Sequence, residues 1–341
     1  MRFPWANILL LFFLFLELVS GFYGLTSGSE ERAFHIQIHR IAGYGIIVVA
    51  AWKVLNVLRS LRWPRAGSVR VASLALVVGL VATMTLGLFW SIGGSYRWWL
   101  FSGMSWHIYA GAAIVPLLVW HSWYMLSKFP IAVWVERRLA IRALGLAVAG
   151  FVGWQLIERT ASSAQLPGSE RRFTGSYGQG EFTGNAFPRV SWLNDNPSRI
   201  DVNDWELRIT GAVDQPTVLN YDDLQSDAEV TATLDCTGGW HTTQLWSGTR
   251  LADLLEQAGP SSEARSIVVR SVTGYYRRYA MRDVDSLILA THVTGDQLSH
   301  GHGFPVRLVA PGRRGFEWVK WVTEIEVDET PSWWQPPLPL Q

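Results

Sequence analysis

The feature that most constrains this chain is a series of five apolar runs in its first half. They lie at about residues 5–24, 34–57, 71–92, 105–127 and 141–158. Each is close to the roughly 20 residues that a helix needs to cross a bilayer. Because a backbone in lipid must satisfy its own hydrogen bonds, the runs predict an all-α bundle of about five membrane-spanning helices.

Lysine and arginine are unevenly distributed over the loops that would join these helices. The loop after the second run contains Arg59, Arg62, Arg65 and Arg70. The segment before the fifth run contains Lys128, Arg137, Arg138 and Arg142. Since basic loops stay in the cytoplasm, we expect a multi-pass protein of the inner (cytoplasmic) membrane whose C-terminal part lies on the periplasmic or extracytoplasmic side, in contact with membrane lipid.

Arg137 and Arg138 allow two interpretations. As membrane anchors they need only their positive charge. As the paired arginines of a twin-arginine export signal, they would direct a folded, cofactor-loaded domain across the membrane. We expect residues 1–130 to form a transmembrane b-type cytochrome domain and residues 131–160 the fifth span with this twin-arginine-like lead.

Four of the eight histidines lie in or at the edge of the apolar runs, where ionisable side chains indicate function. His39 and His107 each precede a glycine by four residues, Gly43 and Gly111, which would leave room for a flat macrocycle. Both histidines would lie near the outer ends of their helices and could ligate one haem iron from opposite sides. The alternative is that each only forms a hydrogen bond to a neighbouring helix.

His121 follows His107 by 14 residues, about 21 Å along a helix and nearly on the same face. In this respect the first four runs resemble the b-type cytochrome subunits of membrane formate dehydrogenases and hydrogenases, whose fourth helix carries two such histidines. The first run lacks the histidine that this family uses for its inner haem, and its polar candidates are Asn7 and Glu17.

The resemblance implies haem b. We expect one haem on His39 and His107, while a second haem on His121 stays open. His121 could instead contact a quinone, and His35 is either an alternative ligand or a proton-relay group.

Beyond the fifth run, the composition becomes that of a soluble protein. Residues 161–180 are predicted to be a linker and residues 331–341 a tail. Between them, residues 181–330 contain short alternating runs typical of strands: WELRITGAV, EVTATLDC, SIVVRSV, VRLVAP and VTEIEV. With helices expected at LADLLEQAG and MRDVDSLILA, the predicted class of this domain is α+β.

Cys236 is the only cysteine, so the chain has no intramolecular disulfide. It lies in the motif LDCTGGW, residues 234–240. A lone cysteine is most often a small buried hydrophobe. As a thiolate, it is also a soft ligand for a metal.

Four motifs in order resemble the molybdopterin-binding domain of the sulfite oxidase family over residues 181–328. They are WELRITGAV, LDCTGGW, WSGTRLADLL and GHGFPVRLVAPGRRGFEWVKWVTEIEV. The resemblance implies that Cys236 is a ligand of molybdenum. It also implies molybdopterin contacts at Arg307, Trp318, Val319 and Lys320, and further at Asn185, Ser271 and His302.

The residue types suit such a cofactor, because an arginine fork and a lysine point charge both bind phosphate. The alternatives are a salt-bridged strand arginine at Arg307 and a solvated lysine at Lys320. Four more cationic side chains could line the mouth for an anionic substrate or could be surface charges: His241, Arg277, Arg278 and Arg313.

Together the two halves imply a molybdopterin-dependent enzyme that exchanges electrons with quinone through haem. This layout is similar to the periplasmic methionine-sulfoxide reductase system, which implies reduction of an S- or N-oxide, either a small molecule or protein-bound, at the expense of quinol. Sulfite-type oxidation that delivers electrons to quinone is the alternative, and a non-catalytic receptor or assembly module is another. A net charge of +1 gives no indication of nucleic acid as a partner.

Overall fold

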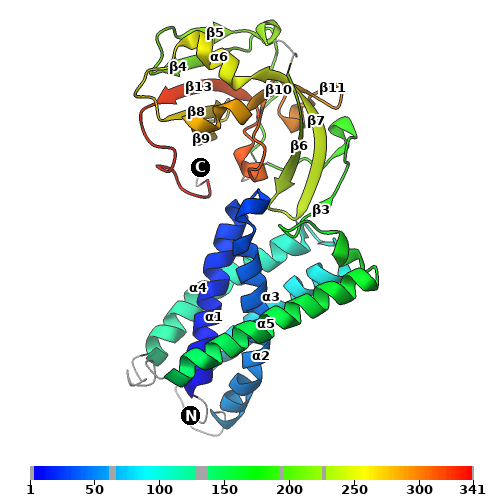
Figure 1. The fold of residues 1–341 in the computed structure, drawn as a ribbon, viewed down its shortest axis with the longest axis vertical. Coiled ribbons are helices and arrows are strands. Elements are labelled where there is room, and N and C mark those ends of the chain that lie inside the picture. The colour runs from blue at the N-terminus through cyan, green and yellow to red at the C-terminus, as the bar shows by residue number, and fades with distance from the viewer. Residues whose placement is uncertain (1–3, 61–66, 127–136, 192–194, 225–227, 340–341) are drawn as a thin grey trace. The chain divides into compact units, whose positions relative to one another are not determined.

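A computed structural model of the chain describes residues 4–60, 67–126, 137–191, 195–224 and 228–339. The chain divides into two compact units, Met1–Tyr177 and Gly178–Gln341 (Figure 1). Arg62, Arg65 and Lys128 of the predicted basic loops lie outside the described residues, as does the boundary expected between residues 130 and 131.

The described part of the first unit contains five long helices (Figure 1). They are α1 (Pro4–Thr26), α2 (Phe34–Ser60), α3 (Gly67–Gly93), α4 (Gly103–Leu126) and α5 (Arg137–Ser163). All five are long and apolar enough to cross a membrane. The predicted runs are therefore found as helices, and α5 begins four residues before its apolar run because it includes the polar lead from Arg137.

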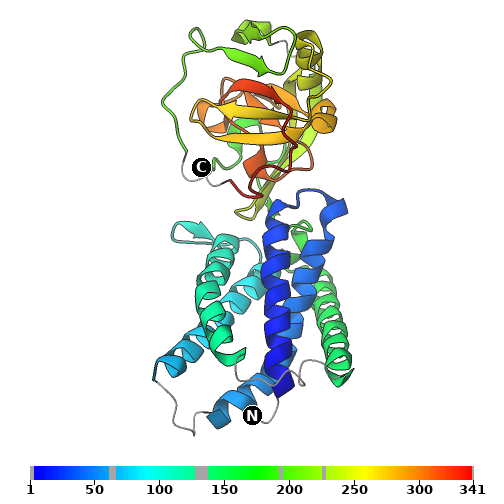
Figure 2. The same cartoon turned by 90° about the vertical axis from the view of Figure 1, so that its left-hand side faces the viewer.

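Within this unit α1 packs beside α2, α2 beside α5, and α3 beside α4 (Figure 2). Phe13, Ile46 and Leu146 lie in the core shared by α1, α2 and α5. Phe15 and Val78 are 61% and 68% exposed, which suits a surface surrounded by lipid. A short hairpin of β1 (Arg97–Trp98) and β2 (Phe101–Ser102) precedes α4.

Much of the segment that we expected as a linker is folded onto these helices. α5 continues to Ser163, and a 3-10 turn follows at Pro167–Glu170. Trp90 donates its indole N–H to the Gly175 carbonyl at 2.7 Å, and the Tyr177 hydroxyl donates to the Trp90 carbonyl. Because these bonds satisfy polar groups of the segment, residues up to Tyr177 belong to the helical unit.

The chain enters the second unit at β3 (Tyr177–Gly178), and two sheets then make up most of that unit. One sheet has the order β5-β4-β13-β8-β9: Thr217–Leu219, Leu207–Gly211, Val322–Asp328, Ser266–Ser271 and Tyr276–Ala280. In it β13 pairs parallel with β4 and antiparallel with β8. The second sheet contains β6 (Ala228–Cys236), β7 (Trp240–Arg250), β10 (Ile288–Val293), β11 (Asp296–Gln297) and β12 (Arg307–Val309).

The helix predicted at LADLLEQAG is found as α6 (Leu251–Ala258), whose apolar face is buried. The helix expected at MRDVDSLILA is wrong. Met281–Ser286 forms a 3-10 turn, and the following residues form β10, which pairs with both β7 and β12. A short apolar run can form either a helix or a central strand. Here it forms a strand, because it lies buried between β7 and β12. The α+β class of the unit is as predicted.

Candidate functional site

Cys236 is the last residue of β6 and pairs with Trp240, the first residue of β7, so the motif LDCTGGW is a tight hairpin. Gly239 closes the turn with a φ of 88°, a conformation that favours glycine, and donates its N–H to the Cys236 carbonyl at 3.1 Å. The N–H of Gly238 points at Sγ at 3.4 Å. Burial raises the pKa of the Cys236 thiol, while this N–H and the Arg314 guanidinium act in the opposite direction.

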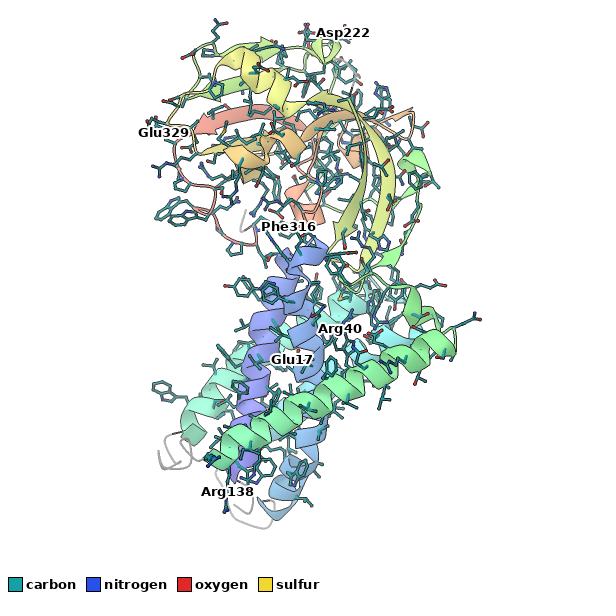
Figure 3. The ribbon with its side chains drawn as sticks, viewed as in Figure 1. Glu17, Arg40, Arg138, Asp222, Phe316 and Glu329 are labelled. Atoms are coloured by element: carbon teal, nitrogen blue, oxygen red, sulfur yellow. The ribbon has the colours of Figure 1, made fainter. Side chains whose placement is uncertain are left out.

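A cavity of about 490 Å³, part of which is open to solvent, lies beside this hairpin. It brings together four of the predicted cofactor residues: Cys236, His302, Arg307 and Lys320. The rest of its wall is mainly apolar and aromatic and comprises Phe187, Pro188, Val190, Ser191, Leu234, Thr237, Trp240, Gly315 and Phe316. Phe316, one of the aromatic residues of this wall, is labelled in Figure 3. The cavity therefore combines a thiol, two cations and aromatic faces.

Arg307, at the start of β12, is 3% exposed. Its Nη1 donates to the His302 carbonyl at 3.1 Å, and its guanidinium lies 5.5 Å from the Trp246 ring centre. It forms no ion pair with a carboxylate of the described residues, and its Nε–H has no hydrogen-bond partner among them. Burial lowers its pKa to about 9. A buried cation with an unused N–H can accept an anion, so the interpretation as a salt-bridged arginine is not supported.

Lys320 is drawn into the protein and is not a solvated surface lysine. Its Nζ donates to the carbonyls of Gly301 at 2.7 Å and Val190 at 3.0 Å. Burial and the nearby Arg307 lower its pKa to about 7. Because the Lys320 ammonium group loses its proton easily, an anion bound beside it would strongly stabilise its charged form.

His302 is held as the neutral imidazole. Its Nε2 lies 3.1 Å from the Phe187 carbonyl and must carry the hydrogen, so Nδ1 accepts from the Ser299 hydroxyl at 2.8 Å. Burial and Arg307 lower the pKa of His302 to about 4. Both ring nitrogens are thus used within the domain, and His302 presents mainly its ring to the cavity.

The other predicted cofactor contacts do not line the cavity. Asn185 clamps a loop, since it accepts from the Ser299 N–H at 2.8 Å and donates to the Gln297 carbonyl at 2.9 Å. Ser271 closes a turn by accepting from Thr273. Trp318 and Val319 are 2% and 1% exposed and support the cavity from the core.

The cations suggested for the substrate mouth also lie outside the cavity wall. Arg278 pairs with Asp328 at 2.6 Å, and Arg313 pairs with Asp283 at 2.6 Å. His241 lies 3.4 Å from Glu181. Arg277 is 3% exposed, with its guanidinium 5.3 Å from the ring centre of Phe316. Ion pairs therefore account for the charges of Arg278 and Arg313, whereas Arg277 has no carboxylate partner among the described residues.

The aromatic wall and Arg314 are what sequence reasoning missed. Phe187 and Phe316 lie far apart in the chain, in segments without strand periodicity, so no pattern brings them together. Arg314 could have been noticed as the second arginine of PGRRG, directly before the glycine that approaches the Cys236 Cα.

In the helical unit, His39 on α2 and His107 on α4 have ring centroids 6.0 Å apart. If both imidazoles ligated one metal ion from opposite sides, their ring centroids would have a similar separation. It would consist of two metal–nitrogen bonds of about 2 Å each plus the distance from each nitrogen to its ring centroid. The Nδ1 of His39 lies 2.7 Å from the Glu17 carboxylate, and the Nδ1 of His107 donates to the Thr83 carbonyl at 2.9 Å. Ligating histidines commonly donate Nδ1–H in this way and keep Nε2 for the metal.

The glycines that make room beside these histidines are not all the ones that we predicted. A Cβ at Gly43 would lie 2.8 Å from the Glu17 carboxylate, so this glycine makes room for Glu17. A Cβ at Gly21 or Gly87 would lie 3.1 Å or 2.9 Å from the ring of His39 or His107, respectively. The space required by the imidazoles therefore comes from Gly21 and Gly87, which the H-x-x-x-G pattern did not include.

Of the remaining polar candidates, only Glu17 contacts this histidine pair. His35 stacks on Tyr23 with ring centroids 5.3 Å apart. Asn7 accepts from Lys53 at 2.8 Å, whereas Glu17 contacts His39 and not His121. His121 is half-buried on α4.

In the described part of the chain, no group of three or more His, Cys, Asp or Glu side chains is arranged to hold a metal ion. Cys236 and the pair of His39 and His107 each offer fewer protein ligands than that. A metal at either place would therefore take its other ligands from an organic cofactor, which both a pterin dithiolene and a porphyrin provide.

A family model described as "Oxidoreductase molybdopterin binding domain" matches residues 194–334. The NADPH nitrate reductase of Aspergillus niger is 32% identical over 163 residues, which cover 39% of this chain and 19% of that protein. The uncharacterized oxidoreductase YuiH of Bacillus subtilis is 29% identical over 157 residues, which cover 44% of this chain and 79% of that protein. The sulfane dehydrogenase SoxCD of Paracoccus pantotrophus is 28% identical with a TM-score of 0.38, covering 39% of this chain and 40% of that chain.

The C-terminal unit is thus the molybdopterin-binding domain of an oxidoreductase. The chain spans about a fifth of the length of the nitrate reductases that it matches. The cavity fits the cofactor, because it offers a single thiol as a metal ligand and two buried cations toward an anionic group.

Proposed function

We propose that the chain is a membrane-anchored molybdenum oxidoreductase that takes electrons from quinol and reduces an S- or N-oxide outside the cytoplasm. The observation that carries this proposal is the position of Cys236 in the wall of one cavity with Arg307 and Lys320, inside a molybdopterin-binding domain. Bound molybdenum–molybdopterin supplies two-electron oxygen-atom transfer.

The protein residues bind and orient this cofactor. Cys236 provides the thiolate ligand, held at the end of its strand by the turn of Gly238 and Gly239. Arg307, through its Nε–H that has no partner among the described residues, and Lys320, through its Nζ, would bind the anionic part of the pterin.

The wall of the cavity favours a neutral oxide over an anion such as sulfite. Beside Cys236 stand Phe187, Thr237, Trp240 and Phe316, which offer aromatic faces and one hydroxyl. Arg278 and Arg313 are paired with carboxylates elsewhere in the domain. The two cations of the same wall, Arg307 and Lys320, are assigned to the anionic part of the pterin. Because sulfite-type oxidation needs further cations beside the substrate, the alternative in which electrons flow to quinone is supported less well.

For the helical unit we propose one haem b, ligated by His39 and His107. Its support is the centroid separation together with the engagement of both Nδ1 atoms. A second haem at His121 has no histidine opposite it on α1, and His121 is instead proposed to contact the quinone. Bound by His39 and His107, a haem would supply single-electron transfer between quinol and the molybdenum domain.

Arginines at one end of the bundle support the proposed orientation. Arg137, Arg138 and Arg142 lie in the first two turns of α5, and Figure 3 shows Arg138 at the lower end of this helix. With Arg137, Arg138 and Arg142 in the cytoplasm, the soluble unit is periplasmic or extracytoplasmic.

Turnover in proteoliposomes tests this function. Full-length protein with a reduced short-chain quinone is expected to reduce methionine sulfoxide or trimethylamine N-oxide, and Cys236→Ser is the matched inactive control. Oxidation of sulfite with quinone as acceptor, without oxide reduction, would establish the reverse direction. No turnover in either direction by protein loaded with molybdenum would favour the receptor or assembly module.

A further inference from the structure

Arg314 lies against the hairpin that carries Cys236. Its Nη1 is 2.8 Å from Oδ1 of Asp235, and its Nη2 donates to the Cys236 carbonyl at 3.1 Å. The side chains of Arg314 and Asp235 are 4% and 1% exposed. A parallel bridge also joins the backbones of these two residues.

Stability alone does not explain such a pair. Two buried charges lose their hydration, and an apolar pair of similar volume is often at least as stabilising. The Nε–H of Arg314 has no hydrogen-bond partner among the described residues, which adds to the cost of its burial. The pair therefore has a role that apolar side chains could not fill.

That role follows from what surrounds the Cys236 backbone. Its carbonyl accepts from Gly239 and from Arg314. On the other side Gly315 is packed against it, since an added Cβ would lie in van der Waals contact with the Cys236 Cα, at 3.4 Å. With its backbone fixed in this way, the thiol of Cys236 retains freedom only about χ1.

We propose that Arg314, held by Asp235, is a positioning residue that fixes the direction in which the Cys236 sulfur enters the cavity. The proposal rests on the proposed role of Cys236 as the molybdenum ligand. A thiolate donates to a metal through oriented orbitals, so a change in backbone direction alters the sulfur-to-metal charge-transfer absorption and the Mo(V) electron paramagnetic resonance signal.

Three variants of the full-length protein separate positioning from stability. Arg314→Met removes the cation of a buried ion pair and leaves the charge of Asp235 in place, so the unfolding midpoint is expected to fall. The double variant Asp235→Leu with Arg314→Met removes both charges and is expected to recover much of that loss. The control is Arg278→Met with Asp328→Leu, which removes an ion pair of the same domain outside the cavity wall.

In the stability-recovered double variant, the charge-transfer band and the Mo(V) signal are expected to stay shifted. We expect kcat to fall by about tenfold with KM within about twofold of the unaltered protein, because the reacting centre is displaced and the substrate wall is intact. The control variant is expected to keep the unaltered spectrum. A double variant with unaltered spectrum and kcat would overturn the proposal.

A second readout needs no metal. Because Cys236 is the only cysteine, iodoacetamide reports on it alone in protein from cells without molybdopterin. The double variant is expected to react about tenfold faster than the unaltered protein, since the hairpin is released, while the control variant is unchanged. Equal rates in all three proteins would overturn the positioning role. Absence of molybdenum from protein of competent cells would instead contradict the proposed function alone.

Discussion

His39 and His107 lie with ring centroids 6.0 Å apart and ring planes at 87°, and each is oriented through its Nδ1 by a different helix. Glu17 of α1 holds His39, and Thr83 of α3 holds His107. Four helices thus arrange two imidazoles whose Nε2 atoms have no hydrogen-bond partner among the described residues. Such an arrangement would suit the haem ligation proposed above, because ligating histidines are commonly oriented through Nδ1.

Histidine substitutions test the haem. His107→Ala is expected to abolish the absorption bands of reduced haem b, and His39→Ala to do the same or nearly so, because one imidazole cannot hold the iron from both sides. His121→Ala is expected to spare the spectrum and to slow reduction by quinol. Dithionite-reduced minus oxidised spectra measure this, and two haems per chain with one lost in His121→Ala would contradict it.

Glu17→Gln tests the carboxylate beside His39. The substitution removes a negative charge in contact with a proposed ligand, so haem content is expected to persist while the midpoint potential rises. Potentiometric titration measures the change. Glu30→Gln, which alters an exposed carboxylate of the 3-10 turn before α2, is the control and is expected to leave the potential unchanged. Equal potentials in both variants and the unaltered protein would show that Glu17 does not act on the haem.

Lys320 predicts a pH dependence of anion binding in cofactor-free protein. Its pKa is lowered from 10.5 to about 7, so between these values the unfolded chain binds more protons and the free energy of unfolding rises with pH. An anion binds the protonated lysine, so inorganic phosphate is expected to raise the unfolding midpoint more at about pH 6 than at about pH 8. Lys320→Met removes this difference, whereas equal phosphate effects in both proteins would exclude Lys320 from the anion site.

The helices were predictable because a long apolar run has one stable form in lipid. The first strand of the hairpin at Cys236 was predicted from EVTATLDC and is found as β6, but the second strand, β7 from Trp240 to Arg250, was not predicted. Its hydroxyl and amide side chains Thr242, Gln244 and Thr249 are buried, which obscures the alternation of apolar and polar residues that identifies strands.

The resemblance implied all of the cofactor contacts, and those whose charge or thiol chemistry suits a cofactor, Cys236, Arg307 and Lys320, line one cavity. Asn185 and Ser271, suggested only by resemblance, hold loops in this structure. Long-range packing decides such roles, and a local pattern contains no information on it.

Arg137 and Arg138 distinguish export from anchoring. Replacing both with lysine keeps the positive charge, so the soluble unit stays outside if they act only as anchors. If they form an export signal, the same change leaves that unit in the cytoplasm. Protease accessibility in spheroplasts measures the outcome, and digestion of the soluble unit in the lysine variant would remove the export interpretation.

The most direct test of the molybdenum assignment is the metal and pterin content of full-length protein purified from molybdopterin-competent cells, alongside Cys236→Ser. We predict about one molybdenum and one pterin per chain, with metal content and turnover strongly reduced in Cys236→Ser while folding and membrane insertion are retained. Protein without molybdenum, or a Cys236→Ser variant with unaltered metal content and turnover, would contradict the assignment.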